Sequence, residues 1–452
     1  MNAQQYKGTN KLLLGIVLAV LAFWLFAQSM LNIAPDVQKD LGLSSGAINI
    51  GVSITALFSG IFIVVIGGLA DKLGRVKFTY LGLILNIIGS ALLIIASNSL
   101  IFITGRAFQG LAAAFIMPAT MSLVKTYYEG KDRQRAVSFW SIGSWGGSGL
   151  CSLFGGAVSS SLGWRYVFII SIIVSIISIL LIFGTPESKV ESDKKSKFDF
   201  SGLIIFVISM VSLNVFISKV KELGIYNTYM IVCIVIAVVG LISFYKVEIS
   251  KENSFIDFSL FSNRGYLGAT ISNFLLNAVA GTLIVINSYM QQGRGLSSKN
   301  AGMMSLGYLV CVLITIRIGE KLLQKFGSRK PMLMGTFITG IGVALMTLTM
   351  IQGSAYFVLV FLGYALFGTG LGIYATPSTD TAISSVPNQK IGVASGIYKM
   401  ASSLGGAIGV AISAAVYNGF VSHTLGATYG LLTNILFCIF AILSIVFIIP
   451  KK

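Results

Sequence analysis

Few residues of this 452-residue chain could carry charge-based chemistry. There are 15 Asp and Glu residues against 32 Lys and Arg, and one histidine, His423, which we expect to be solvated in a loop. Arg106 and Lys399 fall inside long apolar runs, where a charge is costly and indicates a functional position. Asp380 is the best acidic candidate within an apolar helix, and Glu222 is the second. The sequence contains no GxxxxGK[ST] phosphate loop and no convincing catalytic set, so we expect neither an enzyme nor an ATP-driven machine.

The composition indicates the environment of these residues. Hydrophobic residues make up 55% of the chain and charged residues 10%, against about 25% charged in a soluble domain. This leaves too little polar surface to cover a water-soluble globule, which excludes soluble enzymes, secreted disulfide scaffolds and disordered chains. The cysteines lie in apolar runs without paired spacing, so we expect no disulfide, no metal site and no cofactor.

Fourteen apolar segments approach the length of about 20 residues that a helix needs to cross the hydrocarbon. The first follows a polar N-terminus and has no small-residue cleavage site, so it is interpreted as a permanent span and not a signal peptide. We therefore predict an all-α polytopic membrane protein. The expected spans are 12–34, 47–69, 78–97, 100–126, 136–157, 163–184, 200–218, 226–245, 266–290, 301–318, 331–351, 355–382, 391–418 and 428–449.

The distribution of basic residues predicts the orientation. With the N-terminus inside, the termini and inward loops hold 23 of the 32 Lys and Arg, and the outward loops hold five. Lys and Arg accumulate on the cytoplasmic side of membrane proteins, so both termini are expected in the cytoplasm. The net charge of +17 is therefore explained by the basic residues of the expected cytoplasmic loops and termini. Nucleic acid binding is not needed to explain it.

An internal repeat predicts the domain organisation. Pro118 and Gly146-Gly147 recur as Pro377 and Gly405-Gly406, at one common offset of 259 residues. A duplicated six-helix half is a common way to build a transporter. We expect two six-helix halves, two inserted helices and two cytoplasmic connectors. The boundaries are 1–184 for the first half, 185–199 for a connector, 200–245 for the inserted helices, 246–265 for a second connector and 266–452 for the second half.

The connector between the second and third spans reads GGLADKLGRVK. Its glycines permit a tight turn and close helix approach, and its charges can form ion pairs at the cytoplasmic rim. The segment resembles the signature loop of the major facilitator superfamily, in which the acid and the arginine form a latch. A purely topological role for the charges is the alternative. The residues that the resemblance assigns to this conformational latch are Gly67, Asp71, Gly74, Arg75 and Lys77.

The fourth span contains GRAFQG, which resembles a second motif of the same superfamily. The resemblance implies that Arg106 takes part in proton coupling. The alternative is that its guanidinium snorkels to the outer surface, about two helical turns away.

The fifth span is rich in glycine and resembles the antiporter motif of drug exporters, but Cys151-Ser152 stand where that motif has a Gly-Pro pair. Small residues let membrane helices pack closely, so plain packing is the alternative to an antiport role. The candidate positions are Gly143, Gly146, Gly147, Gly155 and Gly156.

Nearly the whole chain resembles the fourteen-span drug:proton antiporters, most closely the Nor-type quinolone efflux pumps of Gram-positive bacteria. The strings LNIAPDVQ, IYATPSTDTA and GIYKMASSLGGAIGVA carry this likeness. Many relatives hold an aspartate in the first span, where Phe26-Ala27-Gln28 stand here. Proton coupling therefore needs another acid, and the candidates are Asp380 and Glu222. The alternative interpretation of Asp380 is a solvated charge at a helix end, and that of Glu222 is a surface ion pair.

Lys399 and a set of aromatic residues are the candidates for substrate contact. Lys399 lies about 13 Å into its span, and its equivalent in the first half is Trp140. Pairing of the ammonium with helix carbonyls is the alternative to a cavity role. Aromatic faces suit ring-bearing ligands and cations, although interfacial belts and packing also use them. The expected cavity residues are Phe23, Trp24, Gln28, Phe115, Trp140, Trp145, Tyr374, Tyr398 and Lys399.

Together these features predict a major facilitator fold that exports hydrophobic or amphipathic drugs, quinolone-like compounds included, in exchange for protons. The expected location is the bacterial plasma membrane, and the expected partners are small molecules, protons and lipid, with no nucleic acid and with the chain as a monomer. A proton-coupled nutrient symporter or facilitator of the same fold is the alternative. A receptor or scaffold would need an attached signalling domain, and no predicted loop exceeds twenty residues.

Overall fold

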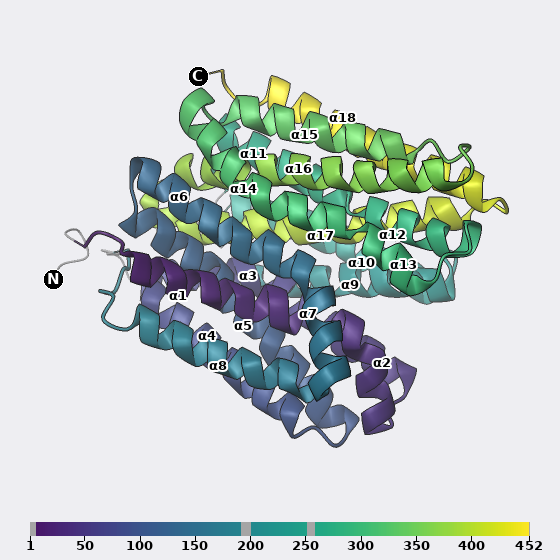
Figure 1. Cartoon of the computed structure of the whole chain (residues 1–452). Helices are drawn as coiled ribbons and strands as arrows, with labels where there is room; N and C mark the ends of the chain where they lie inside the picture. Colours follow the sequence, from purple (N-terminus) through teal and green to yellow (C-terminus); the bar gives the residue numbers. More distant parts are fainter. Residues whose placement is uncertain (1–5, 191–199, 251–257, 452) are drawn as a thin grey trace. The chain divides into compact units, whose positions relative to one another are not determined.

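The computed structural model describes residues 6–190, 200–250 and 258–451, which contain helices and no β-strand. The helices form two compact units (Figure 1). Unit 1 contains Met1–Glu129, Gly143–Leu260 and Val386–Ile397, and unit 2 contains Gly130–Ile142, Phe261–Ser385 and Tyr398–Lys452. The prediction of an all-helical chain is confirmed.

Unit 1 is built around α5, against which α3 and α4 pack. Helix α8 covers α4 and α1, while α9 pairs with α10 and contacts α3. The helices of this unit are α1 (Asn10–Leu21), the π-helical turn η1 (Ala22–Ala27), α2 (Met30–Leu41), α3 (Ser45–Leu73), α4 (Arg75–Ile94), α5 (Ser99–Tyr127), α7 (Gly147–Leu162), α8 (Arg165–Ile182), α9 (Phe200–Leu223), α10 (Thr228–Ile249), the short 3-10 turn η5 (Asn388–Lys390) and the first three residues of another, η3 (Phe258–Ser262).

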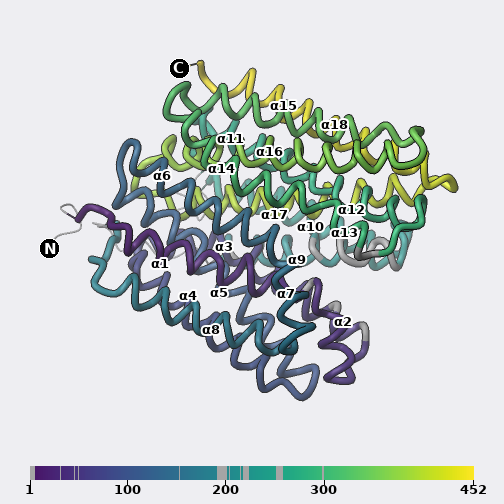
Figure 2. The backbone as a smooth tube through the Cα atoms, viewed as in Figure 1, coloured from purple at the N-terminus to yellow at the C-terminus, as the bar shows by residue number. Residues whose placement is uncertain are grey.

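Unit 2 is built around α16, against which α14 and α15 pack. Helix α15 also lies alongside α18, as the tube in Figure 2 shows. The helices of this unit are α6 (Gly130–Ser141), α11 (Arg264–Ala278), α12 (Gly281–Ser288), the π-helical turn η4 (Tyr289–Gly293), α13 (Ser298–Met304), α14 (Leu306–Phe326), α15 (Arg329–Met346), α16 (Ser354–Ser384), α18 (His423–Phe447) and most of α17 (Ile391–Asn418).

Within the described ranges, eleven helical stretches are long and apolar enough to cross a membrane. Each of the fourteen expected segments overlaps helix, but 136–157, 200–218 and 331–351 do not meet that criterion. Four expected spans are also interrupted. The π-helical turn η1 breaks 12–34, and the π-helical turn η2 (Ile142–Gly146) breaks 136–157. Two turn residues separate α11 from α12 within 266–290, and one separates α13 from α14 within 301–318. Glycine, which has a low helix propensity, occupies two positions of η2.

One part of the expected first half packs elsewhere. Helix α6 contacts α14 and α16 and therefore belongs to unit 2, although 1–184 was expected as one half. The start of α17, residues 391–397, conversely belongs to unit 1. At the repeat offset of 259 residues, 130–138 corresponds to 389–397, so the exchanged segments occupy equivalent positions in the two copies.

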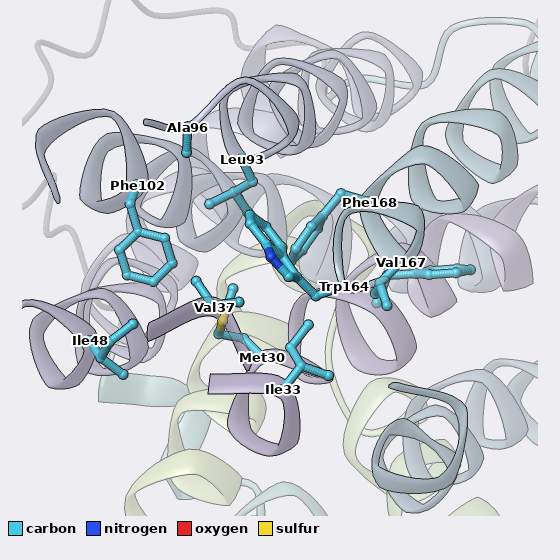
Figure 3. Packing of buried hydrophobic residues seen from close by; sticks show 11 residues of the cluster. Met30, Ile33, Val37, Ile48, Leu93, Ala96, Phe102, Trp164, Val167 and Phe168 are labelled. Atoms are coloured by element: carbon cyan, nitrogen blue, oxygen red, sulfur yellow. The ribbon is translucent and has the colours of Figure 1, made fainter. Parts of the chain in front are cut away.

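A hydrophobic cluster fixes one end of unit 1. Trp164, which precedes α8, and Phe168 of α8 meet edge to face, with ring centroids 6.0 Å apart, beside Leu93 of α4 and Met30 of α2 (Figure 3). Phe102 of α5 is fully buried in the same cluster. Because these side chains come from four helices, the cluster holds α2, α4, α5 and α8 in one arrangement.

Candidate functional site

The expected latch is a buried ion pair at the junction of α3 and α4. Asp71 lies in the last turn of α3 and Arg75 begins α4, and Gly74 joins them with φ of +127°, a conformation that favours glycine. The Arg75 Nη2 lies 2.8 Å from Asp71 Oδ1, and both side chains are 4% exposed. Such a pair is strongly coupled, because removal of either partner leaves a buried charge uncompensated.

The pair is tied to the beginning of α17. The Gly392 N–H donates to Asp71 Oδ2 at 2.6 Å, and Arg75 Nη2 donates to the Asn388 carbonyl at 2.6 Å. The first N–H groups of a helix lack partners within the helix, and a carboxylate is stabilised beside them. Gly67 of α3 lies so close to Gly392 that a Cβ would collide with its carbonyl group. The absence of side chains at both positions permits this contact.

Two residues that sequence reasoning missed complete the latch. Glu187 accepts from the Val76 and Lys77 N–H groups, both at 2.9 Å, and so caps α4. Ser188 accepts a hydrogen bond from Arg75 at 3.1 Å. Lys77 itself has an exposed side chain. The signal for Glu187 was the acid itself, in the polar connector after the sixth span, but nothing in its spacing indicated α4.

Arg106 of α5 is buried, with 1% of its surface exposed. Its guanidinium donates to the Gly51 carbonyl at 3.1 Å, to the Ala27 carbonyl at 2.9 Å and to Gln109 Oε1 at 2.5 Å. The snorkelling alternative is therefore wrong. The arginine joins α5 to α3 and to η1, at the place where the first span loses its regular α-helical hydrogen bonds.

Asp380 is buried in α16, with 5% of its surface exposed, so it is not a solvated helix-end charge. Its Oδ1 lies 3.0 Å from Nε of Arg133 in α6. Sequence reasoning did not single out Arg133, which reads as one of several basic residues in a cytoplasmic loop. The side chain of Glu222, the other acidic candidate, lies outside the described residues.

Lys399 and Trp140 contact each other. The Lys399 Nζ lies 4.3 Å from the Trp140 ring centroid, Lys399 is 8% exposed and Trp140 is fully buried. A cation over an indole face is the most favourable form of the cation–π interaction. The sequence indicated that these positions are equivalent in the repeat but not that they touch.

The other expected cavity residues fall into different settings. Tyr374 and Tyr398 are buried, and Ser378 Oγ lies 2.9 Å and 2.8 Å from their hydroxyl groups. Phe23 packs edge to face on Trp24 in η1, with ring centroids 5.2 Å apart. Three residues are half-buried: Gln28, Phe115, which stacks on Phe78, and Trp145. The structure thus brings Tyr374 and Tyr398 together in one polar cluster and Trp140 together with Lys399.

Three glycines of the fifth span lie at close helix contacts. A Cβ on Gly143 would lie 3.3 Å from the Val17 carbonyl oxygen, on Gly147 it would lie 3.0 Å from Trp24 Cβ, and on Gly155 it would lie 2.8 Å from Ser29 Cβ. Gly156 faces open space, and Gly146 is buried in η2. Close packing against the first span therefore accounts for the first three glycines.

Comparisons with known proteins place the chain in a family. The model of the Major Facilitator Superfamily matches residues 12–410. The chain is 54% identical over 452 residues to the "Quinolone resistance protein NorB" of Staphylococcus aureus strain MRSA252, with 99% of this chain and 98% of that protein covered. The same figures hold for the protein of that name in strain COL.

A solved structure supports the fold. The human organic anion transporter MFSD10 (TETRAN) superposes with a TM-score of 0.64 at 15% identity, over 96% of this chain and 98% of that chain. At this identity the likeness concerns the fold alone. The chain belongs to the Major Facilitator Superfamily and is a multi-pass transporter of the plasma membrane, not an enzyme.

Proposed function

We propose that this chain exports quinolones and other amphipathic drugs from the cytoplasm in exchange for protons. The observation that carries the proposal is the 54% identity, over nearly the full length of both chains, to proteins named for quinolone resistance. A resistance protein lowers the internal drug concentration, so export is favoured over the uptake alternative. Proton coupling is implied by the family.

The charged residues support a coupled carrier. Asp71, Arg75, Arg106 and Asp380 are all buried, and each holds polar partners on other helices. Buried charges of this kind are costly in a membrane and mark substrate or ion pathways and proton relays. We assign the latch role to Asp71 and Arg75 with Gly67, Gly74 and Lys77, and proton coupling to Arg106, Asp380 and Glu222.

The finer topology belongs to the same proposal. Fourteen spans follow if the α6–α7 segment, α9 and α15 cross the membrane beside the eleven stretches that are long and apolar enough by themselves. An even number leaves both termini on one side, and the basic loops favour the cytoplasm. Two six-helix halves, 1–184 and 266–452, with 200–245 inserted between connectors, remain our proposed evolutionary units, and we propose a monomer as the working unit.

Drug accumulation in a pump-deficient bacterium tests the function. Expression of the chain should lower norfloxacin accumulation several-fold, and an uncoupler that collapses the proton gradient should restore it. A strain that carries the Asp71→Asn variant at equal abundance controls for expression of a membrane protein. Equal accumulation with and without the active chain would contradict the proposal.

A further inference from the structure

The turn between α14 and α15 gathers basic side chains at one end of unit 2. Phe326 ends α14, and Arg329 and Lys330 begin α15. The Nζ atoms of Lys325 and Lys330 lie 5.2 Å and 5.6 Å from the ring centroid of Phe326, which is exposed. Two cations thus lie at one aromatic ring, and a ring attracts cations without carrying a net charge that would neutralise them.

Acidic residues do not balance this charge. Asp380 is the only acid between residues 321 and 452, and it pairs with Arg133. Glu320 precedes Lys321 in α14, but its side chain is buried and pairs with Arg317. Within the described part of the chain, four basic side chains near the turn form no ion pair: Lys321, Lys325, Arg329 and Lys330.

The turn is the repeat counterpart of the latch turn between α3 and α4, at an offset of 253 residues. The glycine and both lysines of the latch sequence DKLGRVK recur as Lys325, Gly327 and Lys330. Its aspartate and its arginine are replaced by Gln324 and Ser328. The second copy keeps the lysines but cannot form the latch ion pair, so a latch does not account for them.

Lysines continue the exposed apolar faces of both helices. Residues three or four positions apart share a helix face. On α15, exposed apolar side chains follow Lys330 at this spacing: Met334, Phe337 and Ile341. On α14, the exposed Lys321 and Lys325 continue an apolar series in the same register: Val310, Ile314 and Ile318. In a membrane such faces contact acyl chains, so the lysines lie where the acyl chains meet the headgroups.

Helix α18 borders the turn. Helices α15 and α18 lie side by side (Figure 1), and Arg329 Nη2 donates to the Val446 carbonyl near the end of α18. The Nε of Arg329 is buried and has no hydrogen-bond partner among the described residues. A buried N–H group without a partner is uncommon, and an oxygen of a bound phosphate group would satisfy it.

We propose that the α14–α15 turn binds an anionic phospholipid of the adjacent leaflet, which is the cytoplasmic leaflet in the proposed orientation. Lys325 and Lys330 bind the headgroup phosphate, and the acyl chains lie along the exposed faces of α14 and α15. Groups of about four to eight Lys and Arg beside a membrane helix are typical of binding to anionic headgroups. The lysines select the headgroup, and the apolar faces hold the chains. This binding goes beyond the proposed drug export and depends neither on drug nor on a proton gradient.

Native mass spectrometry of the full-length protein tests the site, with phosphatidylglycerol and phosphatidylcholine of identical acyl chains as probes. The wild type should bind phosphatidylglycerol at least about fivefold more tightly, because each basic residue near the headgroup adds to the attraction. Lys325→Gln/Lys330→Gln should reduce this preference to less than about twofold, since the variant keeps the apolar faces and loses the charges. Lys325→Arg/Lys330→Arg should retain the preference of the wild type.

Lys7→Gln/Lys131→Gln is the matched control, because it removes the same charge from two exposed lysines that are expected on the same side of the membrane. This variant should keep the preference of the wild type. An equal loss in the control, or an unchanged preference in Lys325→Gln/Lys330→Gln, would overturn the site. Displacement of phosphatidylglycerol by millimolar inorganic phosphate would show a general anion site and would overturn the lipid assignment.

The outcome is separable from that of drug export. The binding measurement contains no drug and no gradient, so its failure would leave the proposed function standing. A wild type that exports no drug but prefers phosphatidylglycerol would overturn the proposed function and support the lipid site.

Discussion

The Asp71 carboxylate of α3 accepts a hydrogen bond from the Gly392 N–H at the beginning of α17, at 2.6 Å. The same carboxylate also pairs with Arg75. One buried charge thus joins the helix pair α3–α4 to the first turn of a helix 321 positions further along the chain. Movement of α17 away from α3 would break this bond and expose the ion pair.

Asp71→Asn should reduce transport at least tenfold while membrane abundance stays within about twofold of the wild type. The amide keeps one oxygen acceptor, but the charge that pairs with Arg75 and faces the helix N-terminus is lost. Transport assays with quantitative immunoblots check this. Lys131→Gln is the control, because Lys131 is exposed, lies outside the latch and should matter little. Full transport by Asp71→Asn would rule out the latch.

Asp380→Asn should abolish gradient-driven export and preserve substrate binding. Its carboxylate is buried against Arg133, so protonation would release that arginine, which is the behaviour expected of a coupling site. Arg133→Gln should also impair export, since it leaves the carboxylate buried without its ion-pair partner. Asp132→Asn, on an exposed neighbour, is the matched control. If Asp380→Asn and Glu222→Gln both export normally with the gradient, coupling runs elsewhere.

The ion pair between Asp40 and Arg165 should stabilise the protein fully above the usual carboxylate pKa of 3.8 and progressively less as the pH falls below it. Hydrogen bonds from Arg165, and secondarily from Trp164, lower the pKa of Asp40 below its usual 3.8. Because the folded state has the lower pKa, the stabilisation is complete above the unfolded value and is lost as the pH falls through the folded value. The pair is half-exposed, so its contribution is below about 1 kcal/mol.

Thermal unfolding of Asp40→Asn checks this pH dependence. The variant should unfold at a slightly lower temperature than the wild type at pH 7. The difference in unfolding temperature should be the same at pH 6. The difference should shrink below pH 4. A difference that grows on acidification has the wrong sign for a carboxylate whose pKa is lowered by folding.

Phe102→Ala should destabilise unit 1 by about 3 to 5 kcal/mol, the range for a large aromatic residue removed from a packed core. Phe102 is fully buried in the cluster shown in Figure 3. Leu100→Ala, two residues earlier and 74% exposed, should change the unfolding temperature little. Equal shifts for the two variants would show that this cluster does not stabilise the unit.

The sequence predicted the charged turn between α3 and α4 but not the distant residues that bond to it. Asp71, Gly74 and Arg75 lie within five residues, and their spacing alone indicates a charged turn between helices. Glu187 and Gly392 could not be found in this way, because their contacts with the turn depend on how distant helices pack. The same holds for Arg133, which pairs with Asp380 at a separation of 247 positions.

The helical interruptions were not predictable from hydropathy. The segment Ala22–Ala27 reads AFWLFA, as apolar as the α-helix before it, yet it forms a π-helical turn. Arg106 donates to the carbonyl of Ala27, the last residue of that turn. A contact with another helix therefore favours a backbone conformation that the local sequence does not specify.

The most direct test of proton-coupled export is norfloxacin transport by purified protein in proteoliposomes with an imposed pH difference and no ATP. The drug should cross the membrane in the direction opposite to the protons. It should accumulate against its gradient only while the pH difference lasts. Dissipating the difference with a protonophore should return the drug to equilibrium. Accumulation in the same direction as proton flow, or accumulation that survives the protonophore, would contradict the exchange of drug for protons.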